Sequence, residues 1–547
     1  MEKNKKQALI LSIVAAVTLI ALVVGATYAY FKAQGGTAGS TEVKVTTYTT
    51  DMLTFTTGSA ISLYADQSSF GQEKGSLSGE TFAKATLVAN NKTNEATDNY
   101  YVYFNIENNT FKYTLGEDKP ELILTVTGPD GSEVTEISGL THTTVQDREN
   151  KSISGFDVTT TNGIISIANK KTITATTDAT EEQYTLKLTF VNYEGDQTAN
   201  ATSTLSAKVM IQKKMIPFHE TCNDNTLACH MAKLYTGTQG ANNIYYHDAS
   251  LTNGAGDNSY RYAGASDQVN NYVCFGSTES PCPEDNLYRI IGVFDNKVGE
   301  NQTEQRVKLI KADYAPSALL GTDGDYKDKY TTIASTNNWS NSDYKGNNLA
   351  NIAGYSWNYK NNTSINSGKG SNTWSTSLLN KTNLNTNFIT KIGAEWANKI
   401  DMTTWKVGGN TWSNIGTQPA KTAYQNEIVS PVTTNTTDNA TTYSAKVGLM
   451  YASDYGFAAA PSAWTANLYT YNGDAIKNVN WMYMGLLEWT VSRYADFAYG
   501  VFRVSYTGFV DGGDATYALA VRPAFNLKSS VTYVEGDGTQ SSPVRIN

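Results

Sequence analysis

The sequence predicts a multidomain chain, with an all-β sandwich followed by an α+β domain. Residues 41–212 contain short runs of alternating apolar and polar residues between Asn, Gly and Asp turns, which is typical of a sandwich. After residue 241, strand-like runs are separated by long loops rich in Asn, Thr, Gly and Trp. Apolar residues spaced four apart in Leu378–Ile400 predict one clear helix in this second half.

The individual elements follow from the same patterns. In the first half the expected strands are Tyr100–Ile106, Glu121–Thr127, Gly163–Ile167, Tyr184–Val191 and Thr204–Ile211. In the second half we expect strands at Tyr288–Phe294 and Arg306–Ile310. Thr226–Tyr235 is expected to form a short helix capped by Asn225 or Thr226.

The N-terminus predicts export. Met1–Lys6 holds three lysines and one glutamate, and Ala8–Tyr28 contains no charged residue, which is the form of a secretory signal. Thr27 and Ala29 are small enough for a signal peptidase, so cleavage after Ala29 is expected. The alternative is an uncleaved membrane anchor, because the apolar run is long enough to span a bilayer. In both cases the rest of the chain lies outside, and membrane contact is limited to this segment.

Composition favours recognition over nucleic-acid binding. The formal net charge is -9, so no basic surface for nucleic acid is implied. Only 17% of residues are charged, whereas the chain holds 35 Tyr and 9 Trp. Uncharged, hydrogen-bonding and aromatic surfaces suit adhesive and recognition proteins. No cofactor motif is present, and the partner we expect is an extracellular protein or glycan.

The four cysteines form two close pairs in the sequence. Six residues separate Cys222 from Cys229, and seven separate Cys274 from Cys282. In an oxidising compartment each pair is expected to form a local disulfide. A zinc site of four thiolates is the alternative, although the spacings are wider than CxxC knuckles. Spacing alone leaves the other pairings open.

The first half resembles the TasA/camelysin family of exported proteins. The resemblance rests on Gly25–Phe31, which looks like a SipW-type signal peptide, on Tyr100–Ile106, and on Leu188–Asn192 followed by Asp196-Gln197 and Asn200. It implies a jelly-roll-like sandwich whose members build surface fibres by lending an N-terminal strand to a neighbour. In this chain that strand would lie within residues 30–50, where Glu42–Tyr48 alternates.

The second half resembles a C-type-lectin-like domain of exported bacterial proteins. The matching stretches, in chain order, are Arg261–Gly264, Asn271–Val273, Tyr288–Phe294, Val447–Gly456, Glu488–Thr490, Val521–Leu527 and Gly536–Thr539. The implied fold is shared with formylglycine-generating enzymes and with the variable proteins of diversity-generating retroelements. That fold hosts unrelated functions, so it does not name one.

These patterns and resemblances divide the chain into four parts. We expect a signal peptide or membrane anchor at 1–29 and a TasA/camelysin-like sandwich at 30–213. A disulfide-containing junction at 214–240 and a lectin-like recognition domain at 241–547 complete the chain.

The segment between Trp489 and Pro523 is the most informative part of that domain. Arg493–Ala520 contains no Lys, Gln, Glu, Met, Trp or Asn, and each of its residues is reachable from an AAC or AAT codon by changing adenines. That is the mark of retroelement mutagenesis, although a glycine-rich strand–turn–strand would use similar residues. Exposed Tyr and Phe among Gly and Ser are efficient contact residues. The expected ligand contacts are Tyr494, Asp496, Phe497, Tyr499, Tyr506, Phe509, Asp511, Asp514 and Tyr517.

Other positions near this segment are expected to form its support. Phe502, Val504 and Tyr506 share one face of an extended run, which makes Tyr506 the weakest expected contact. Leu519, Val521, Phe525 and Leu527 are expected to point inward. An inward Arg522 would have to be hydrogen-bonded.

Enzymatic and metal-dependent readings find less support in the sequence. Asp323, Asp325 and Asp328 do not match a calcium loop and are expected to form a solvated acidic turn. No HExxH, GxSxG or phosphate-loop motif occurs. We therefore expect a non-catalytic adhesin or receptor-like protein, secreted or on the surface of a Gram-positive bacterium. A structural fibre subunit is the first alternative, and a secreted enzyme on the same fold is the second.

We predict that the exported protein begins near Tyr30, after cleavage at Ala29, because the lysines, the apolar run and the small residues stand in the order of a cleaved signal. N-terminal sequencing of protein recovered from outside the cell checks this. A mature chain that still begins at Met1 would identify the segment as an anchor.

Overall fold

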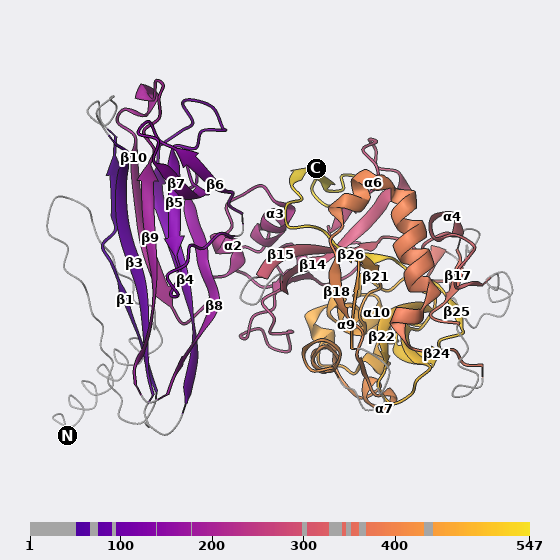
Figure 1. Ribbon diagram of the computed structural model, residues 1–547. Helices are drawn as coiled ribbons and strands as arrows, with labels where there is room; N and C mark the ends of the chain where they lie inside the picture. Colours follow the sequence, from indigo (N-terminus) through magenta and orange to yellow (C-terminus); the bar gives the residue numbers. More distant parts are fainter. Residues whose placement is uncertain are drawn as a thin grey trace, which may run out of the picture. The chain divides into compact units, whose positions relative to one another are not determined.

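The computed structural model describes residues 51–65, 75–89, 95–137, 139–176, 178–297, 303–327, 342–345, 352–359, 368–431 and 441–547. These residues form two compact units, drawn from indigo to yellow along the chain in Figure 1. Of the described residues, those up to Asp224 with Lys297 and Thr303 form unit 1, and those at 225–296 and 304–547 form unit 2. The expected signal, its cleavage site at Ala29 and the expected exchange strand within 30–50 lie outside the described residues.

Unit 1 is a sandwich of two antiparallel sheets. One sheet has the order β1 (Met52–Thr57), β3 (Leu77–Val88), β9 (Thr180–Phe190), β5 (Leu122–Thr127), β7 (Ser152–Asp157) and β6 (His142–Gln146). The other has the order β2 (Ile61–Tyr64), β10 (Thr204–Gln212), β4 (Ala96–Asn109) and β8 (Gly163–Ala175). Short helices η2 (Thr198–Asn200) and α2 (Phe218–Thr221) complete it.

The core of unit 1 follows from the alternation that predicts its strands. Buried side chains from both sheets form one apolar cluster, which includes Leu87 of β3, Phe104 of β4, Leu124 of β5 and Val209 of β10. Every strand expected in the first half is present, with Glu121 and Val191 lying one residue outside β5 and β9. Period-2 spacing therefore identifies the inner face of each sheet correctly.

One buried carboxylate joins two loops at the edge of this core, the β4–β5 and β9–β10 connections. Glu121 is fully buried, and its side chain accepts hydrogen bonds from the backbone N–H and hydroxyl of Thr114, from Gln197 Nε2 at 3.0 Å and from Asn200 Nδ2 at 2.6 Å. A carboxylate without water is stable only when such donors surround it. This contact accounts for the Gln197 and Asn200 positions that carry the family resemblance.

All four cysteines are disulfide-bonded. Cys274 is bonded to Cys282, with Cα atoms 5.9 Å apart, which leaves Cys222 with Cys229. The prediction of two local disulfides is confirmed, and the four sulfurs are not available as zinc ligands.

Unit 2 is built on a mixed set of short strands. Its largest sheet has the order β11 (Ile244–Tyr246), β12 (Tyr260–Tyr262), β14 (Leu287–Lys297), β15 (Thr303–Lys311), β26 (Ala524–Asn526) and β21 (Val447–Gly448), with β13 (Tyr272–Cys274) also paired to β14. A second sheet has the order β19 (Gly409–Asn410), β22 (Glu488–Tyr494), β23 (Gly500–Val504) and β24 (Val510–Asp514). Smaller sheets are β16 (Tyr326–Lys327), β17 (Gly354–Ser356) and β25 (Ala518–Leu519), then β18 (Thr403–Lys406) with β20 (Thr442–Ala445), and β27 (Tyr533–Glu535) with β28 (Arg545–Ile546).

The helices of unit 2 are mostly short. They are α3 (Leu227–Lys233), α4 (Ser317–Leu320), α6 (Ile389–Lys399), α7 (Trp412–Ile415), α8 (Ala420–Tyr424), α9 (Ala452–Ala458) and α10 (Asp474–Lys477). The 3-10 helices are η3 (Ala241–Asn243), η4 (Glu284–Asn286), η6 (Trp374–Thr376), η9 (Pro461–Ala463) and η10 (Leu468–Thr470). The π-helices are η7 (Leu379–Phe388) and η8 (Gln425–Val429). Thr226 caps α3 by accepting from the backbone N–H of Cys229, as expected.

The long predicted helix is present as η7 followed by α6, with its backbone interrupted at Gly393, where φ is +82°. Leu384, Phe388 and Trp396 of the expected stripe are buried. The side chain of Asp325 caps the N-terminus of this helix from another segment. Its carboxylate accepts hydrogen bonds from the backbone N–H groups of Leu378 and Leu379 at 2.9 and 3.0 Å. The expectation of a solvated turn at Asp325 is therefore wrong, since this side chain is buried and caps a helix.

The described chain is thus mostly antiparallel β-sheet, with a sandwich in unit 1. In this part of the chain, no helix is both long enough and apolar enough to cross a membrane.

Candidate functional site

The segment singled out by sequence folds as the hairpins β22–β23 and β23–β24 at one edge of unit 2 (Figure 1). Residues facing each other across an antiparallel pair share a face, so Phe502 lies with its partner Gly512 and Arg503 with Asp511. Phe502 and Val504 are buried, as predicted. Leu519, Val521, Phe525 and Leu527 are buried too, which confirms their expected inward direction.

Tyr494 lies inside this sheet instead of on its surface. Its side chain is only 6% exposed, and its ring packs 4.7 Å from the ring of Phe502. A Cβ atom at Gly512 would stand 1.5 Å from Tyr494 Oη, and one at Gly500 would stand 1.9 Å from the ring. Glycine at both positions therefore leaves the space that the tyrosine ring occupies. Burial raises the pKa of the Tyr494 hydroxyl.

The other expected contacts are distributed over partly and fully exposed positions. Phe497 is 41% and Tyr517 40% exposed. Half-buried positions are Asp496, Tyr499, Tyr506, Phe509, Asp511 and Asp514. Tyr494 thus supports the surface from below, whereas Phe497 and Tyr517 are the expected aromatic contacts that solvent reaches most.

Two of the three expected acidic contacts are engaged inside the protein. Asp496 accepts from the backbone N–H of Trp412 at 3.0 Å, where α7 begins. Asp511 forms an ion pair with Arg503 across β23 and β24, with Nε and Oδ1 2.8 Å apart. The ring of Tyr517 lies 5.7 Å from the Arg503 guanidinium and against Gly513. These carboxylates fix the positions of aromatic neighbours, and Arg503 sets the charge beside Tyr517.

Three exposed aromatic residues from distant segments join Phe497 and Tyr517. Trp412 lies on α7, which packs against β24, and is 58% exposed. Tyr469, which is 54% exposed, packs its ring 5.0 Å from that of Phe509, just before β24. Tyr359 is 47% exposed and follows Asn358, whose backbone N–H bonds Ala515 O just after β24. We call Tyr359, Trp412, Tyr469, Phe497 and Tyr517 the aromatic surface.

Sequence reasoning missed Tyr359, Trp412 and Tyr469. All three lie more than 20 residues before Arg493, in stretches rich in Asn or Gly. No local sequence pattern relates these stretches to β24. Only the fold brings them to the same edge of the sheet.

Buried polar contacts hold this surface on its frame. Asn372 Nδ2 lies 3.0, 2.6 and 3.0 Å from the backbone oxygens of Tyr494, Phe497 and Gly500, so it fixes the β22–β23 loop. Arg522 is 1% exposed and donates to both carboxylate oxygens of Glu488, at 2.7 and 2.8 Å. The expectation that Arg522 is inward and paired is confirmed.

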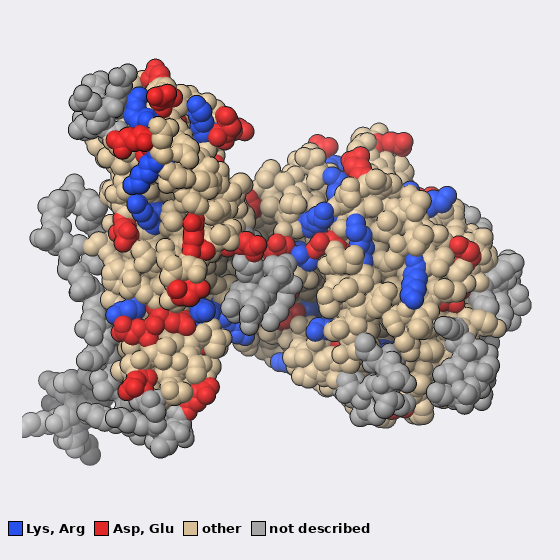
Figure 2. All heavy atoms as spheres, in the orientation of Figure 1, with Lys and Arg blue, Asp and Glu red and all other residues tan. Residues whose placement is uncertain are grey.

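On the face drawn in Figure 2, charged side chains cover a minor part of the described surface. Figure 2 shows acidic and basic residues interspersed on the visible face, without one large patch of a single sign. Among the described residues, no group of three or more His, Cys, Asp or Glu is arranged to hold a metal ion. His247 is fully buried, which lowers its pKa to about 3 and keeps it neutral.

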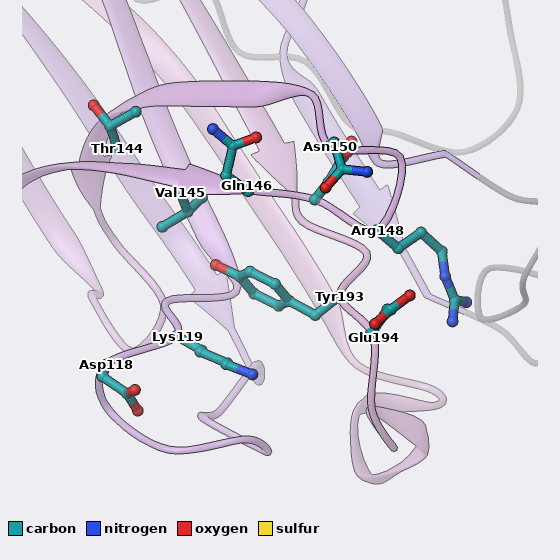
Figure 3. Close-up of a pocket in the computed structure, with 10 residues that line it drawn as sticks. Asp118, Lys119, Thr144, Val145, Gln146, Arg148, Asn150, Tyr193 and Glu194 are labelled. Atoms are coloured by element: carbon teal, nitrogen blue, oxygen red, sulfur yellow. The ribbon is translucent and has the colours of Figure 1, made fainter.

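Unit 1 contains a separate polar pocket of about 380 Å³ (Figure 3). Tyr193 lies at its centre, with Asp118 and Lys119 at the lower left of the view and Arg148 and Glu194 on the right. Its lining mixes both charge signs and offers no exposed aromatic platform. The aromatic surface of unit 2 is therefore the stronger candidate for recognition.

Comparison with known proteins does not place the chain in a family. No protein-family model matches it, and no curated protein matches it in sequence. Among solved structures, the binding domain of botulinum neurotoxin serotype G aligns with 12% identity over 48% of this chain and 69% of that chain, at a TM-score of 0.11. A score that low carries no argument, so the two family resemblances remain expectations from sequence.

We predict that Gly512→Ala destabilises unit 2 by about 2–3 kcal/mol, because the new methyl group would overlap Tyr494. Chemical denaturation followed by Trp fluorescence measures the change. Gly473→Ala is the matched control, since its Cβ would meet nothing within 4 Å. Equal stability of the two variants would show that Tyr494 does not occupy the space above Gly512.

Proposed function

We propose that the chain is an exported cell-surface binding protein, adhesin-like or receptor-like, that contacts an extracellular protein or glycan through the aromatic surface. One observation carries this proposal. All five exposed aromatic residues in the described part of unit 2 lie on segments that contact β24 or its flanking loops. The four other exposed large hydrophobic residues described in unit 2, Leu378, Met402, Val429 and Val534, are not aromatic.

Such a surface gives binding energy at low entropic cost. Tyr, Trp and Phe have few rotatable bonds and large contact areas, so a small number of them dominates many interfaces. The buried contacts of Asn372, Arg522 and Tyr494 keep the supporting loops in one arrangement before a ligand arrives. Preorganisation of this kind reduces the entropy lost on binding.

Further parts of the proposal rest on sequence and composition. Two disulfides and a β-rich fold suit a protein secreted or displayed by a Gram-positive bacterium. The lectin-like resemblance of unit 2 supports a scaffold that tolerates exchange of surface residues. Diversification of residues 493–520 by a retroelement belongs to the same proposal. Gly500 and Gly512 would have to stay glycine in every variant that keeps Tyr494, because a side chain at either position would overlap its ring.

We predict that Phe497→Ala and Tyr517→Ala each weaken ligand binding by roughly 1–3 kcal/mol and leave the melting temperature nearly unchanged. An array of glycans and extracellular-matrix proteins first identifies what the intact protein captures, and the variants are then titrated on those spots. Tyr64→Ala in unit 1 is the control, because Tyr64 is an exposed aromatic residue, at 55%, outside the aromatic surface. A loss of stability with unchanged binding would place both residues in the core and remove the proposal's support.

A fibre subunit is the second candidate function, and the sheet edges of unit 1 favour it. β8 is thirteen residues long and forms an edge of its sheet, and β1 forms an edge of the other. Edge strands of this kind accept an added strand from another chain. In this proposal the strand comes from residues 30–50 of a neighbouring copy.

We predict that deletion of residues 30–50 abolishes fibres seen by electron microscopy, while circular dichroism still reports a folded protein. A chain carrying the same number of residues in scrambled order at 30–50 controls for length. Fibres that form unchanged from the deleted protein would rule out exchange by this segment.

A further inference from the structure

A group of charged side chains lies in the interior of unit 2, away from the aromatic surface. Lys308 projects from β15, Asp454 from α9, Arg261 from β12 and Glu427 from η8. Their exposures are 4%, 2%, 2% and 0%. Burying charges costs several kcal/mol each unless partners compensate, so such a group needs a reason.

Lys308 and Asp454 meet at bonding distance in an aromatic environment. Lys308 Nζ lies 2.5 Å from Asp454 Oδ2. The rings of Tyr451, Trp405 and Phe294 surround Nζ, with centroids at 4.4, 5.4 and 5.9 Å. Burial lowers the pKa of Lys308 against the opposing effect of Asp454, a direction that favours the neutral, nucleophilic form of the amine.

The remaining oxygen of the same carboxylate forms an ion pair with Arg261. Arg261 Nη1 is buried without a hydrogen-bond partner in the described structure and lies 3.6 Å from Asp454 Oδ1. The other side of the guanidinium is held by Asp257, with Nη2 and Oδ2 2.6 Å apart. A fixed cation at this place would stabilise negative charge that develops on Oδ1 when a nucleophile attacks Cγ.

Glu427 is a third group in the same region. Its carboxylate accepts from the backbone N–H of Ser453 at 2.8 Å and from the hydroxyl of Ser492 at 2.5 Å. Burial raises its pKa to about 7, so it holds or releases a proton near neutrality. Because Ser453 precedes Asp454, Glu427 also positions the turn that presents the carboxylate to Lys308.

A buried ion-pair network accounts for the distances from Asp454 to Lys308 and to Arg261, and within it Arg261 Nη1 makes no hydrogen bond. A nucleophile, an electrophile, an oxyanion donor and a proton-exchanging acid, all in one dry site, make up the parts of an acyl transfer. Held reactants of this kind reach effective molarities of about 10⁵–10⁸ M, which favours a condensation that does not occur between free groups in water.

We propose that Lys308 and Asp454 condense after folding to form an intramolecular amide cross-link. The Lys308 amine attacks Asp454 Cγ, the Nζ–Cγ bond forms and the Cγ–Oδ2 bond breaks. Oδ2 leaves with two protons as one water molecule, and no oxidant or reductant takes part. The bond ties β15 to α9 across 146 positions of the chain and makes unit 2 resistant to unfolding.

Mass spectrometry of the full exported chain tests the proposal. Its intact mass should be one water below the disulfide-bonded sequence mass. Proteolysis should yield a branched peptide that joins the Lys308 and Asp454 fragments. After complete unfolding and reduction, acetic anhydride should modify every lysine except Lys308. An intact mass without the loss, together with fully acetylated Lys308, would overturn the proposal.

Variants separate the cross-link from a merely structural role. Lys308→Met should restore the missing water, whereas Lys311→Met, which removes another buried lysine, should keep the loss. Glu427→Gln should slow the appearance of the lighter mass in newly synthesised chains, followed by pulse-chase labelling, without changing its final value. If Lys308→Met does not fold, the branched peptide of the unaltered protein still decides the question. Loss of the same water from Lys308→Met would contradict the assignment.

Discussion

The aromatic surface depends on one buried ion pair, between Arg522 and Glu488. Glu488 is the first residue of β22, and Arg522 lies between β25 and β26, so the pair fixes the β22–β24 sheet to the strand that enters the largest sheet of unit 2. Arg522 also donates to the backbone oxygen of Met482 at 2.8 Å, which fixes the chain before β22. Removing one partner of such a pair typically costs about 3–5 kcal/mol, because the other charge stays buried.

Different kinds of contact stabilise the two units. Unit 1 relies on a continuous apolar core between two sheets, with the Glu121 carboxylate as a polar anchor at its edge. Unit 2 has short strands and long loops, and it uses buried polar side chains to hold them. Asp325, Asn372, Arg522 and the group around Lys308 each join segments far apart in sequence. Rigid loops of this kind can present side chains to a ligand without strands beneath each one.

Local patterns predict much of the fold because they act over a few residues. Alternation identifies the strands of unit 1, cysteine spacing identifies both disulfides, and the parity of Leu519 to Leu527 identifies the inner face. The same reasoning gives the wrong prediction at Tyr494, because long-range packing buries its side chain. Glycines beside an aromatic residue look like an exposed turn, whereas Gly500 and Gly512 are small because the tyrosine ring lies on them. Trp412 and Tyr469 reach β24 through folding alone, so no pattern within 493–520 indicates them.

The central claim is that recognition takes place on the aromatic surface. Oxidative footprinting of the intact protein, with and without the ligand it captures, tests this most directly, because exposed aromatic side chains react and covered ones do not. The account predicts ligand-dependent protection of Trp412, Tyr469, Phe497 and Tyr517, with unchanged reactivity at Tyr64. Protection confined to unit 1, with full reactivity of these four residues in the complex, would contradict it.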